Sequence, residues 1–192
     1  MQVFFDGEPV PVLYAQSRQI NAAAPVALAG KSTASVTVTY NDQQFGPISA
    51  PVTFGSPGIF RLQVGQSAQA VAMNQDWTLN GPSNPAARGS VVTVWATGYG
   101  PTNPACATGG LNDPEAEPLS TGIGALLVGG GLFDAPYAGS APDLVCGVVQ
   151  INFQVPANAN PGTYFFVPWV QFVQENSTTT YQPPVGAAIA IK

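Results

Sequence analysis

The feature that most limits the fold is a period of two in the apolar residues. From Thr33 to Tyr40, apolar side chains alternate with hydroxyl-bearing ones, and residues 148–155 and 185–191 alternate in the same way. Alternation of this kind predicts extended strands with one buried face and one solvated face. The 192 residues also include 21 glycines and 19 prolines, which helix interiors tolerate poorly. We therefore expect an all-β protein.

Part of the chain occurs twice. Residues 19–25 match residues 150–156 at Gln, Ile, Asn and Pro with identical spacing, and the Tyr-Ala pair at 14–15 matches the pair at 137–138. A repeat of this length indicates two related units. We expect the isoleucines of the two copies to fill equivalent core positions, with the flanking Gln and Asn bonding nearby backbone. The sequence thus predicts two related antiparallel β-units of the sandwich or barrel kind.

The two units are unequal. The second copy is preceded by an alternating run, Ser90–Thr97, that predicts an opening strand, and the first copy has no counterpart. We expect residues 1–56 to form a partial unit without its opening strands, and residues 57–192 to form a sandwich with an N-terminal hairpin. A unit without its opening strands leaves a sheet edge and a core face uncovered. Three candidates could cover them: the second unit, a strand of a neighbouring copy, or a preceding segment. The residues expected to be buried there are Val36, Val38, Phe45, Ile48 and Phe54.

An ordered set of short motifs spans nearly the whole chain. The segments are Pro11–Ala15, Gln19–Asn21 with Pro25, Pro57–Phe60, Asn74–Asp76 with Thr78–Asn80, Asn84–Gly89, Ala96–Gly98 with Gly100–Pro101, and Gln150–Asn152 with Pro156. This set resembles a bacterial immunoglobulin-like module at the C-terminal end of exported proteins, acidobacterial and Solibacter-type, distantly related to IPT/TIG domains. The resemblance implies two immunoglobulin-like antiparallel β-sandwich units that form an appendage with no catalytic residue. Trp77 departs from it, because a turn glycine is expected there.

The charge composition disfavours several functions. The chain has 5 Lys and Arg against 10 Asp and Glu, for a net charge of -5, and the cations are scattered. Without a basic stripe, we expect no binding to nucleic acid. Histidine is absent, which removes the commonest general base and metal ligand. We therefore expect neither an enzyme nor a cofactor, and we expect no membrane insertion.

The two cysteines, Cys106 and Cys146, are candidates for a disulfide. An even cysteine count in an exported β-protein makes pairing the default, and two separate buried thiols are the alternative. We expect the loops that follow Gly100 and Tyr137 to lie together at one end of the second sandwich.

A cluster of carboxylates, Asp113, Glu115 and Glu117, is the densest charge in the chain. Oxygen ligands of this kind suit Ca²⁺. However, two prolines stiffen the segment and the spacing of a calcium-binding loop is missing. A solvated loop is the favoured interpretation, and a metal site is the weaker one.

An aromatic run between residues 164 and 173 is the remaining candidate. The interface or ligand candidates in it are Tyr164, Phe166, Trp169 and Phe172. A strand that is apolar on both faces either packs between layers or exposes an aromatic strip. Three interpretations stay open at this point: internal packing, contact with another protein chain, and stacking on a glycan.

These observations favour a non-enzymatic structural or adhesive module of an exported or cell-surface bacterial protein, located outside the cell. Its expected partners are other protein chains. One alternative is a subunit of an extracellular filament or surface polymer that assembles by strand-edge contacts. Another is a carbohydrate-binding accessory module of a secreted hydrolase.

Overall fold

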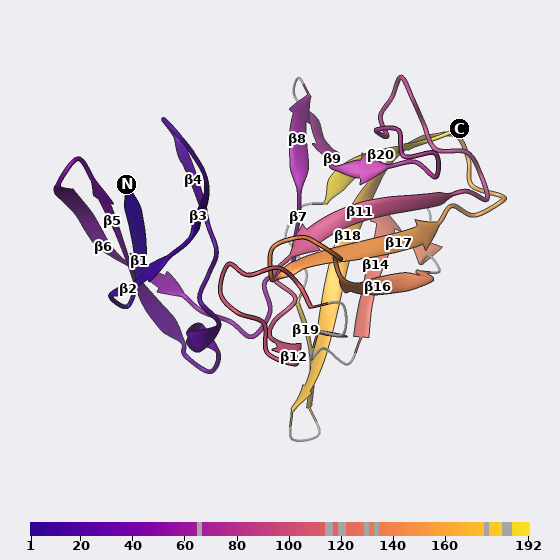
Figure 1. The fold of residues 1–192 in the computed structure, drawn as a ribbon. Helices are drawn as coiled ribbons and strands as arrows, with labels where there is room; N and C mark the ends of the chain where they lie inside the picture. Colours follow the sequence, from indigo (N-terminus) through magenta and orange to yellow (C-terminus); the bar gives the residue numbers. More distant parts are fainter. Residues whose placement is uncertain are drawn as a thin grey trace.

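The computed structural model describes residues 1–64, 67–113, 117–118, 122–128, 131–132, 135–174, 177–181 and 186–192. The described chain consists of β-strands, with one 3-10 turn, η1 (Val26–Leu28). Figure 1 shows the strands in two groups, one built from residues 2–51 and the other from residues 58–191. The two groups share no sheet among the described strands. The expected all-β fold is confirmed.

The first unit contains a four-stranded antiparallel sheet in the order β2-β1-β5-β6 and a separate two-stranded ribbon, β3-β4. Two hairpin turns, Asp6-Gly7 and Asn41-Asp42, have left-handed φ at both central residues, the geometry that suits the twist of a two-residue hairpin. The strands are β1 (Gln2–Phe5), β2 (Glu8–Val10), β3 (Val12–Gln16), β4 (Gln19–Ala22), β5 (Thr33–Tyr40) and β6 (Gln43–Pro51).

The strand register of this sheet gathers apolar side chains on one face. Val36 lies opposite Phe5 on β1 and Ile48 on β6, and Val38 lies opposite Phe45. Directly opposed residues share a face of a sheet, so these side chains form one apolar layer. The hydroxyl-bearing residues of β5 alternate with them and lie on the other face.

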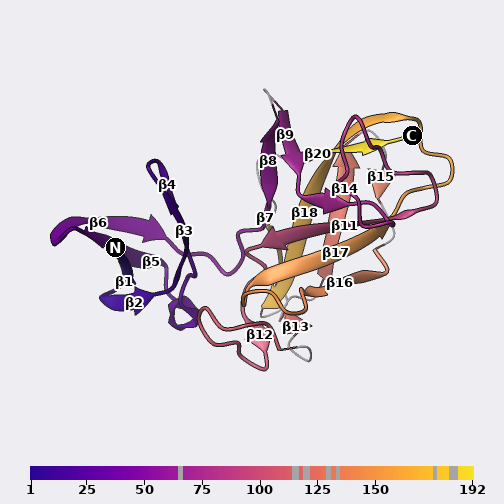
Figure 2. The ribbon, with the colours of Figure 1, turned by 45° about the horizontal axis from the view of Figure 1, so that its top comes forward.

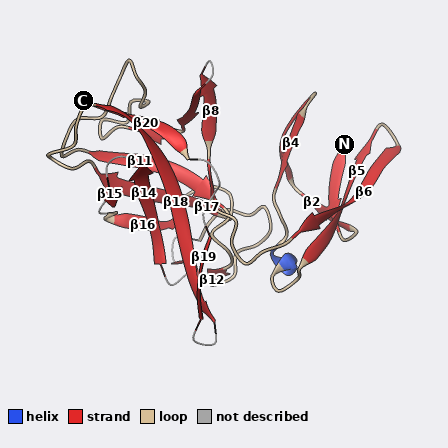
Figure 3. Ribbon diagram, turned by 180° about the vertical axis from the view of Figure 1, so that it is seen from behind, coloured by secondary structure: helices blue, strands red, loops and turns tan. Residues whose placement is uncertain are grey.

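The second unit contains two larger sheets. One has the order β10-β11-β17-β16, with β7 on β11, and the other has the order β15-β14-β18-β20-β9-β8, with β19 on β18. Figure 2 shows the long strand β18 crossing behind β11 and β17, and Figure 3, seen from the opposite side, shows β18 in front of them. The strands are β7 (Gly58–Ile59), β8 (Arg61–Val64), β9 (Ser67–Ala70), β10 (Ala72–Met73), β11 (Val91–Thr97), β12 (Thr102–Asn103), β13 (Glu117–Pro118), β14 (Gly122–Val128), β15 (Gly131–Leu132), β16 (Tyr137–Ser140), β17 (Val148–Gln154), β18 (Gly162–Gln174), β19 (Ser177–Tyr181) and β20 (Ala187–Ile191).

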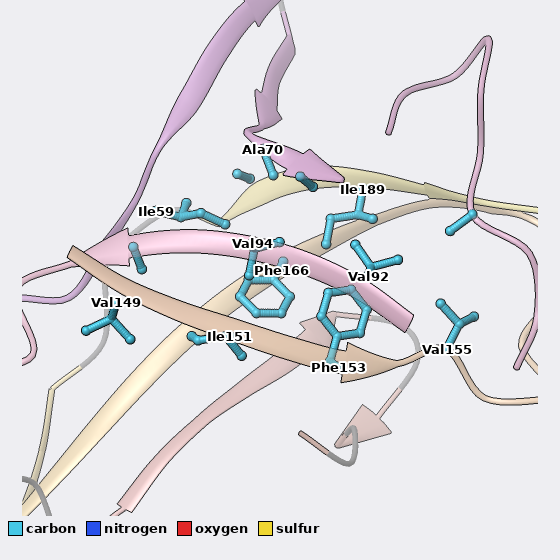
Figure 4. Packing of buried hydrophobic residues seen from close by; sticks show 14 of the residues in the cluster. Ile59, Ala70, Val92, Val94, Val149, Ile151, Phe153, Val155, Phe166 and Ile189 are labelled. Carbon is cyan, nitrogen blue, oxygen red and sulfur yellow. The ribbon is translucent and has the colours of Figure 1, made fainter. Parts of the chain in front are cut away.

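The core of the second unit lies between these two sheets. Alternate residues of β11 and β17 point toward β18 and β20, as Figure 4 shows. Phe153 of β17 packs on Phe166 of β18 with ring centroids 5.1 Å apart. Both side chains are 0% exposed, so the alternation of β17 predicted its buried face correctly. The second unit is therefore a sandwich of two sheets, whereas the first holds one four-stranded sheet and a two-stranded ribbon.

Candidate interaction surfaces

The apolar face of the first unit is covered only in part. Val3, Val10 and Ala34 are buried on this face. Phe45 is 53% exposed and Ile48 is 69% exposed, while Val36 and Val38 are half-buried. Of the three candidates for covering this face, the second unit does not cover Phe45 and Ile48, and the other two stay predictions. Figures 1 and 2 give the reason, because the β3-β4 ribbon stands between the β5-β6 hairpin and the second unit.

The segment that joins the two units packs on the second one. Phe54 meets Phe172 edge-on with ring centroids 4.3 Å apart. The Ser56 N–H donates to the carbonyl of Gly98 at 2.8 Å. The expectation for Phe54 is confirmed, since this ring packs against the core of the second unit. A further contact runs from the Val26 N–H to Thr108 Oγ1 at 3.1 Å.

The aromatic run lies on β18, and two of its candidates belong to the core. Phe166 is 0% exposed and Phe172 is 3% exposed, so an interface role for these two side chains is wrong. They face inward because alternate residues of β18 meet the opposite sheet. Tyr164 and Trp169 are half-buried, and the Tyr164 hydroxyl donates to the carbonyl of Asn160. The sequence alone could not say which face of β18 is covered.

The disulfide between Cys106 and Cys146 is present, with the two Cα atoms 6.0 Å apart. It ties together the two loops that the sequence placed at one end of the second unit, and this prediction is confirmed. The amide of the buried Asn112 lies beside it and donates to the carbonyls of Ala141 at 2.8 Å and Val148 at 2.9 Å. A disulfide is compatible with an oxidising compartment.

The acidic cluster falls largely outside what the structure describes. Asp113 is exposed. Glu115 lies outside the described residues, and of Glu117 only the backbone is described, pairing with Asn103. Across the described part of the chain, no three His, Cys, Asp or Glu side chains gather closely enough to hold a metal ion. The calcium hypothesis stays a prediction.

Two carboxylates form the clearest polar contacts on the surface. Asp6 accepts from Lys31 Nζ at 2.7 Å and from the Ser35 N–H at 2.7 Å, and these bonds lower its pKa, the Lys31 bond having the larger effect. Asp76 accepts from the hydroxyl of Thr78 at 2.6 Å and from its N–H at 3.1 Å, which lowers the pKa of Asp76 in the same way. Hydrogen bonds to a carboxylate favour its charged form.

Asp76 belongs to a turn that presents an exposed tryptophan. Trp77 is 68% exposed and has a left-handed φ of 62°, which is uncommon for a bulky residue. The resemblance had predicted a glycine here, and the backbone has indeed the conformation that favours glycine. The tryptophan in place of the expected turn glycine is visible in the sequence, but no sequence pattern gives Trp77 a role.

The repeated Gln-Ile-Asn motif has the same local geometry in both units. Gln19 Nε2 donates to Asn21 Oδ1 at 2.8 Å, and Gln150 Nε2 donates to the Asn152 side chain at 3.1 Å. The expectation that these amides bond nearby backbone is wrong, because in both units the Gln and Asn side chains bond each other. The isoleucines differ, because Ile151 is 0% exposed and Ile20 is 39% exposed. The expectation that Ile20 fills a core position is wrong, since no strand of the described part of the chain pairs with β4 on the side away from β3.

No protein-family model, no curated protein and no solved structure matches this chain. Its relation to known proteins thus rests on the motif resemblance alone. None of the helical segments in the described ranges is long and apolar enough to cross a membrane.

Proposed function

We propose that the chain is a non-enzymatic structural or adhesive module of an exported or cell-surface bacterial protein, of the immunoglobulin-like kind that its motifs resemble. The partly open face of the first unit carries this proposal. Phe45 and Ile48 are 53% and 69% exposed on a sheet face that also holds Val36 and Val38. Contiguous exposed apolar surface of this kind is typical of protein contact sites.

The packing of the connecting segment supports a mechanical role. Phe54 contacts Phe172, which in turn meets Tyr181 with ring centroids 5.9 Å apart. This cluster fixes the segment on the second unit. A tensile force on the first unit is therefore transmitted to the second unit through packed side chains. Antiparallel sheets that are joined in this way form a stiff spacer that can present a contact face.

The disulfide supports export, because disulfides persist in oxidising compartments. The test is to fractionate the producing bacterium and to count thiols in the natively purified protein. We expect the protein at the cell surface or in the medium, with Cys106 and Cys146 oxidised. Finding it in the cytosol with two free thiols would overturn the proposed location.

The contact role is tested by sedimentation of the chain over a range of protein concentrations. We expect concentration-dependent association that Ile48→Lys weakens, because a charge is costly on a desolvated apolar face. Gln44→Lys is the matched control, since Gln44 is exposed on the same strand but pairs with Thr39 on the opposite face. A monomer under all conditions would argue against the role, and regular polymers would favour the filament alternative.

A second candidate function is glycan binding on the outer face of β18. Phe165 is 50% exposed there, and Trp169 lies half-buried four residues along the same face. Flat aromatic surface of this kind stacks on sugar rings. We expect Trp169→Ala to abolish retention on insoluble polysaccharide if this alternative holds, whereas Leu111→Ala, at a residue 66% exposed elsewhere, should not. Absence of retention by the wild-type chain would exclude it.

A further inference from the structure

The first unit repeats one half of the second, strand for strand. In the β3-β4 ribbon Tyr14 lies opposite Asn21 and Ala15 opposite Ile20. In β16 and β17 the corresponding Tyr137 lies opposite Asn152, and Ala138 lies opposite Ile151. The other sheet repeats as well, since β2-β1-β5-β6 has the same neighbours as β15-β14-β18-β19.

The two copies differ in what lies on the far side of the repeated strand. In the second unit β17 has two neighbours, β16 and β11, and Ile151 lies between Ala138 and Val94. In the first unit β4 pairs with β3 alone. The side chain of Ile20 is consequently 39% exposed, against 0% for Ile151. The position that β11 occupies in the second unit is open beside β4.

The other edges of the first unit are protected against pairing. Pro9 interrupts β2, and Pro47 and Pro51 interrupt β6. Proline has no N–H to donate to a neighbouring strand and is one of the usual means of blunting an edge. The edge strand β3 has a register irregularity, and its counterpart β16 is also an edge.

By contrast, β4 has none of these protections. Its residues, Gln19–Ala22, include no proline and no charged side chain, and the register irregularity of the ribbon lies outside the Gln19–Asn21 pairs. Its counterpart β17 is a central strand. The residues of β4 are therefore of the kind found in a central strand, although β4 lies at the edge of its sheet.

The second unit also shows what chemistry the missing neighbour needs. Val92, Val94 and Ala96 of β11 are each 0% exposed and fill the core from alternate positions. A strand added beside β4 would place a side chain next to the exposed Ile20, as Val94 of β11 lies next to Ile151. It must therefore present apolar side chains at every second residue.

We propose that β4 accepts an extended strand from another polypeptide, antiparallel and with apolar residues at alternate positions, as β11 pairs with β17. This inference deepens the proposed contact function and rests on it. Strand addition of this kind takes affinity from main-chain hydrogen bonds and specificity from the alternating side chains. It also explains why the motif around Ile20 is that of a buried strand.

The chain itself supplies the probe, a labelled peptide of residues 90–97 (Ser-Val-Val-Thr-Val-Trp-Ala-Thr). We expect saturable binding of this peptide to the full chain, measured by fluorescence anisotropy. A peptide with Val92→Asp and Val94→Asp should bind about tenfold more weakly or worse. A peptide that is N-methylated at alternate backbone nitrogens should also lose affinity, because it cannot donate the main-chain hydrogen bonds to β4. A contact made by apolar side chains alone would not be weakened in this way.

Protein variants locate the site. Ile20→Lys should weaken peptide binding about tenfold, whereas Leu62→Lys, at a residue with the same 39% exposure in the second unit, should not. Hydrogen exchange should slow at residues 19–22 when the peptide binds. This readout confirms that each variant is folded and shows where the strand is added.

Three results would overturn the inference. The first is no saturable binding up to the solubility limit of the peptide. The second is binding that Ile20→Lys does not change. The third is unchanged hydrogen exchange at residues 19–22 when the peptide binds, which would place the bound peptide away from β4. If association still responds to Ile48→Lys while the peptide does not bind, the contact function stands and only the strand-acceptor site is wrong.

Discussion

Asn80 binds both backbone groups of Ala190 with its side-chain amide. Its Nδ2 donates to the Ala190 carbonyl at 2.9 Å, and its Oδ1 accepts from the Ala190 N–H at 2.9 Å. The amide also donates to Asn74 Oδ1 at 2.9 Å. Asn80 is 1% exposed, so a turn residue takes the place of a neighbouring strand along this part of β20.

Asn80→Ala should lower the free energy of unfolding by about 2 kcal/mol, because the buried Ala190 N–H loses its partner at about 1–3 kcal/mol. The Ala190 carbonyl keeps the Ala86 N–H, which donates to it at 2.9 Å. Denaturant unfolding measures this loss. Asn158→Ala is the matched control, since Asn158 is exposed, and it should change stability by less than about 0.5 kcal/mol. Equal effects of the two variants would show that the Asn80 network does not stabilise the fold.

The disulfide closes a loop with a sequence separation of 40 residues. Replacing both cysteines by serine should cost about 4 kcal/mol on the chain-entropy model. The measurement compares denaturant midpoints of the wild type and of Cys106→Ser with Cys146→Ser. Reduction of the wild-type chain should lower its midpoint to the same value, and an unchanged midpoint in either case would contradict the prediction.

Much of the fold could be predicted from residue patterns. The alternation from Thr33 to Tyr40 predicted β5. The repeat predicted two related units, because motifs with the same residue spacing pair their strands in the same register. The disulfide followed from the cysteine count and the expected compartment. Each of these features depends on neighbouring residues in the sequence or on one pair of residues. They could therefore be predicted without knowing how the strands pack.

The exposures could not be predicted in the same way. Ile20 and Ile151 have the same sequence neighbours, and only the strand beside each one decides whether it is buried. Phe166 and Phe165 are both apolar, and the register of β18 against β14 and β20 decides which of them reaches the core. Whether a side chain is buried depends on the strand that pairs with its own strand. The residue pattern within one strand does not show which strand that is.

Two glycines offer a matched test of close packing at the end of β11. Gly98 and Gly89 both have left-handed φ, 81° and 74°. A Cβ on Gly98 would collide with the carbonyl of Ser56, whereas a Cβ on Gly89 would meet nothing within 4 Å. Gly89→Ala should thus cost about 1 kcal/mol of backbone strain, and Gly98→Ala should cost distinctly more because the connecting segment must move. Denaturant unfolding compares the two, and equal costs would refute the role of the Ser56 contact.

The stability of the chain should fall in acid through Asp6 and Asp76. Hydrogen bonds lower the pKa of both carboxyls in the folded chain below the ordinary 3.8. Their contribution is therefore present above about pH 4 and is lost as the pH falls through the lowered pKa values. The urea midpoint should decrease below pH 4, and Asp6→Asn with Asp76→Asn should flatten this decrease. Glu8→Gln, which removes a carboxylate outside these two networks, is the control and should flatten it less.

The turn at Trp77 stores strain that glycine would relieve. Trp77 has a φ of 62° and is 68% exposed, so its backbone is strained while its ring gains little from packing. A left-handed L-residue costs about 1–2 kcal/mol, and glycine adopts this conformation without that cost but loses more entropy on folding. Trp77→Gly should consequently stabilise the chain by about 1 kcal/mol, seen as a higher denaturant midpoint at an unchanged slope. Asn41→Gly is the control at a similar φ of 47°, and it should gain less because asparagine tolerates the left-handed region. A loss of stability in Trp77→Gly would mean that the tryptophan ring contributes packing that outweighs its backbone strain.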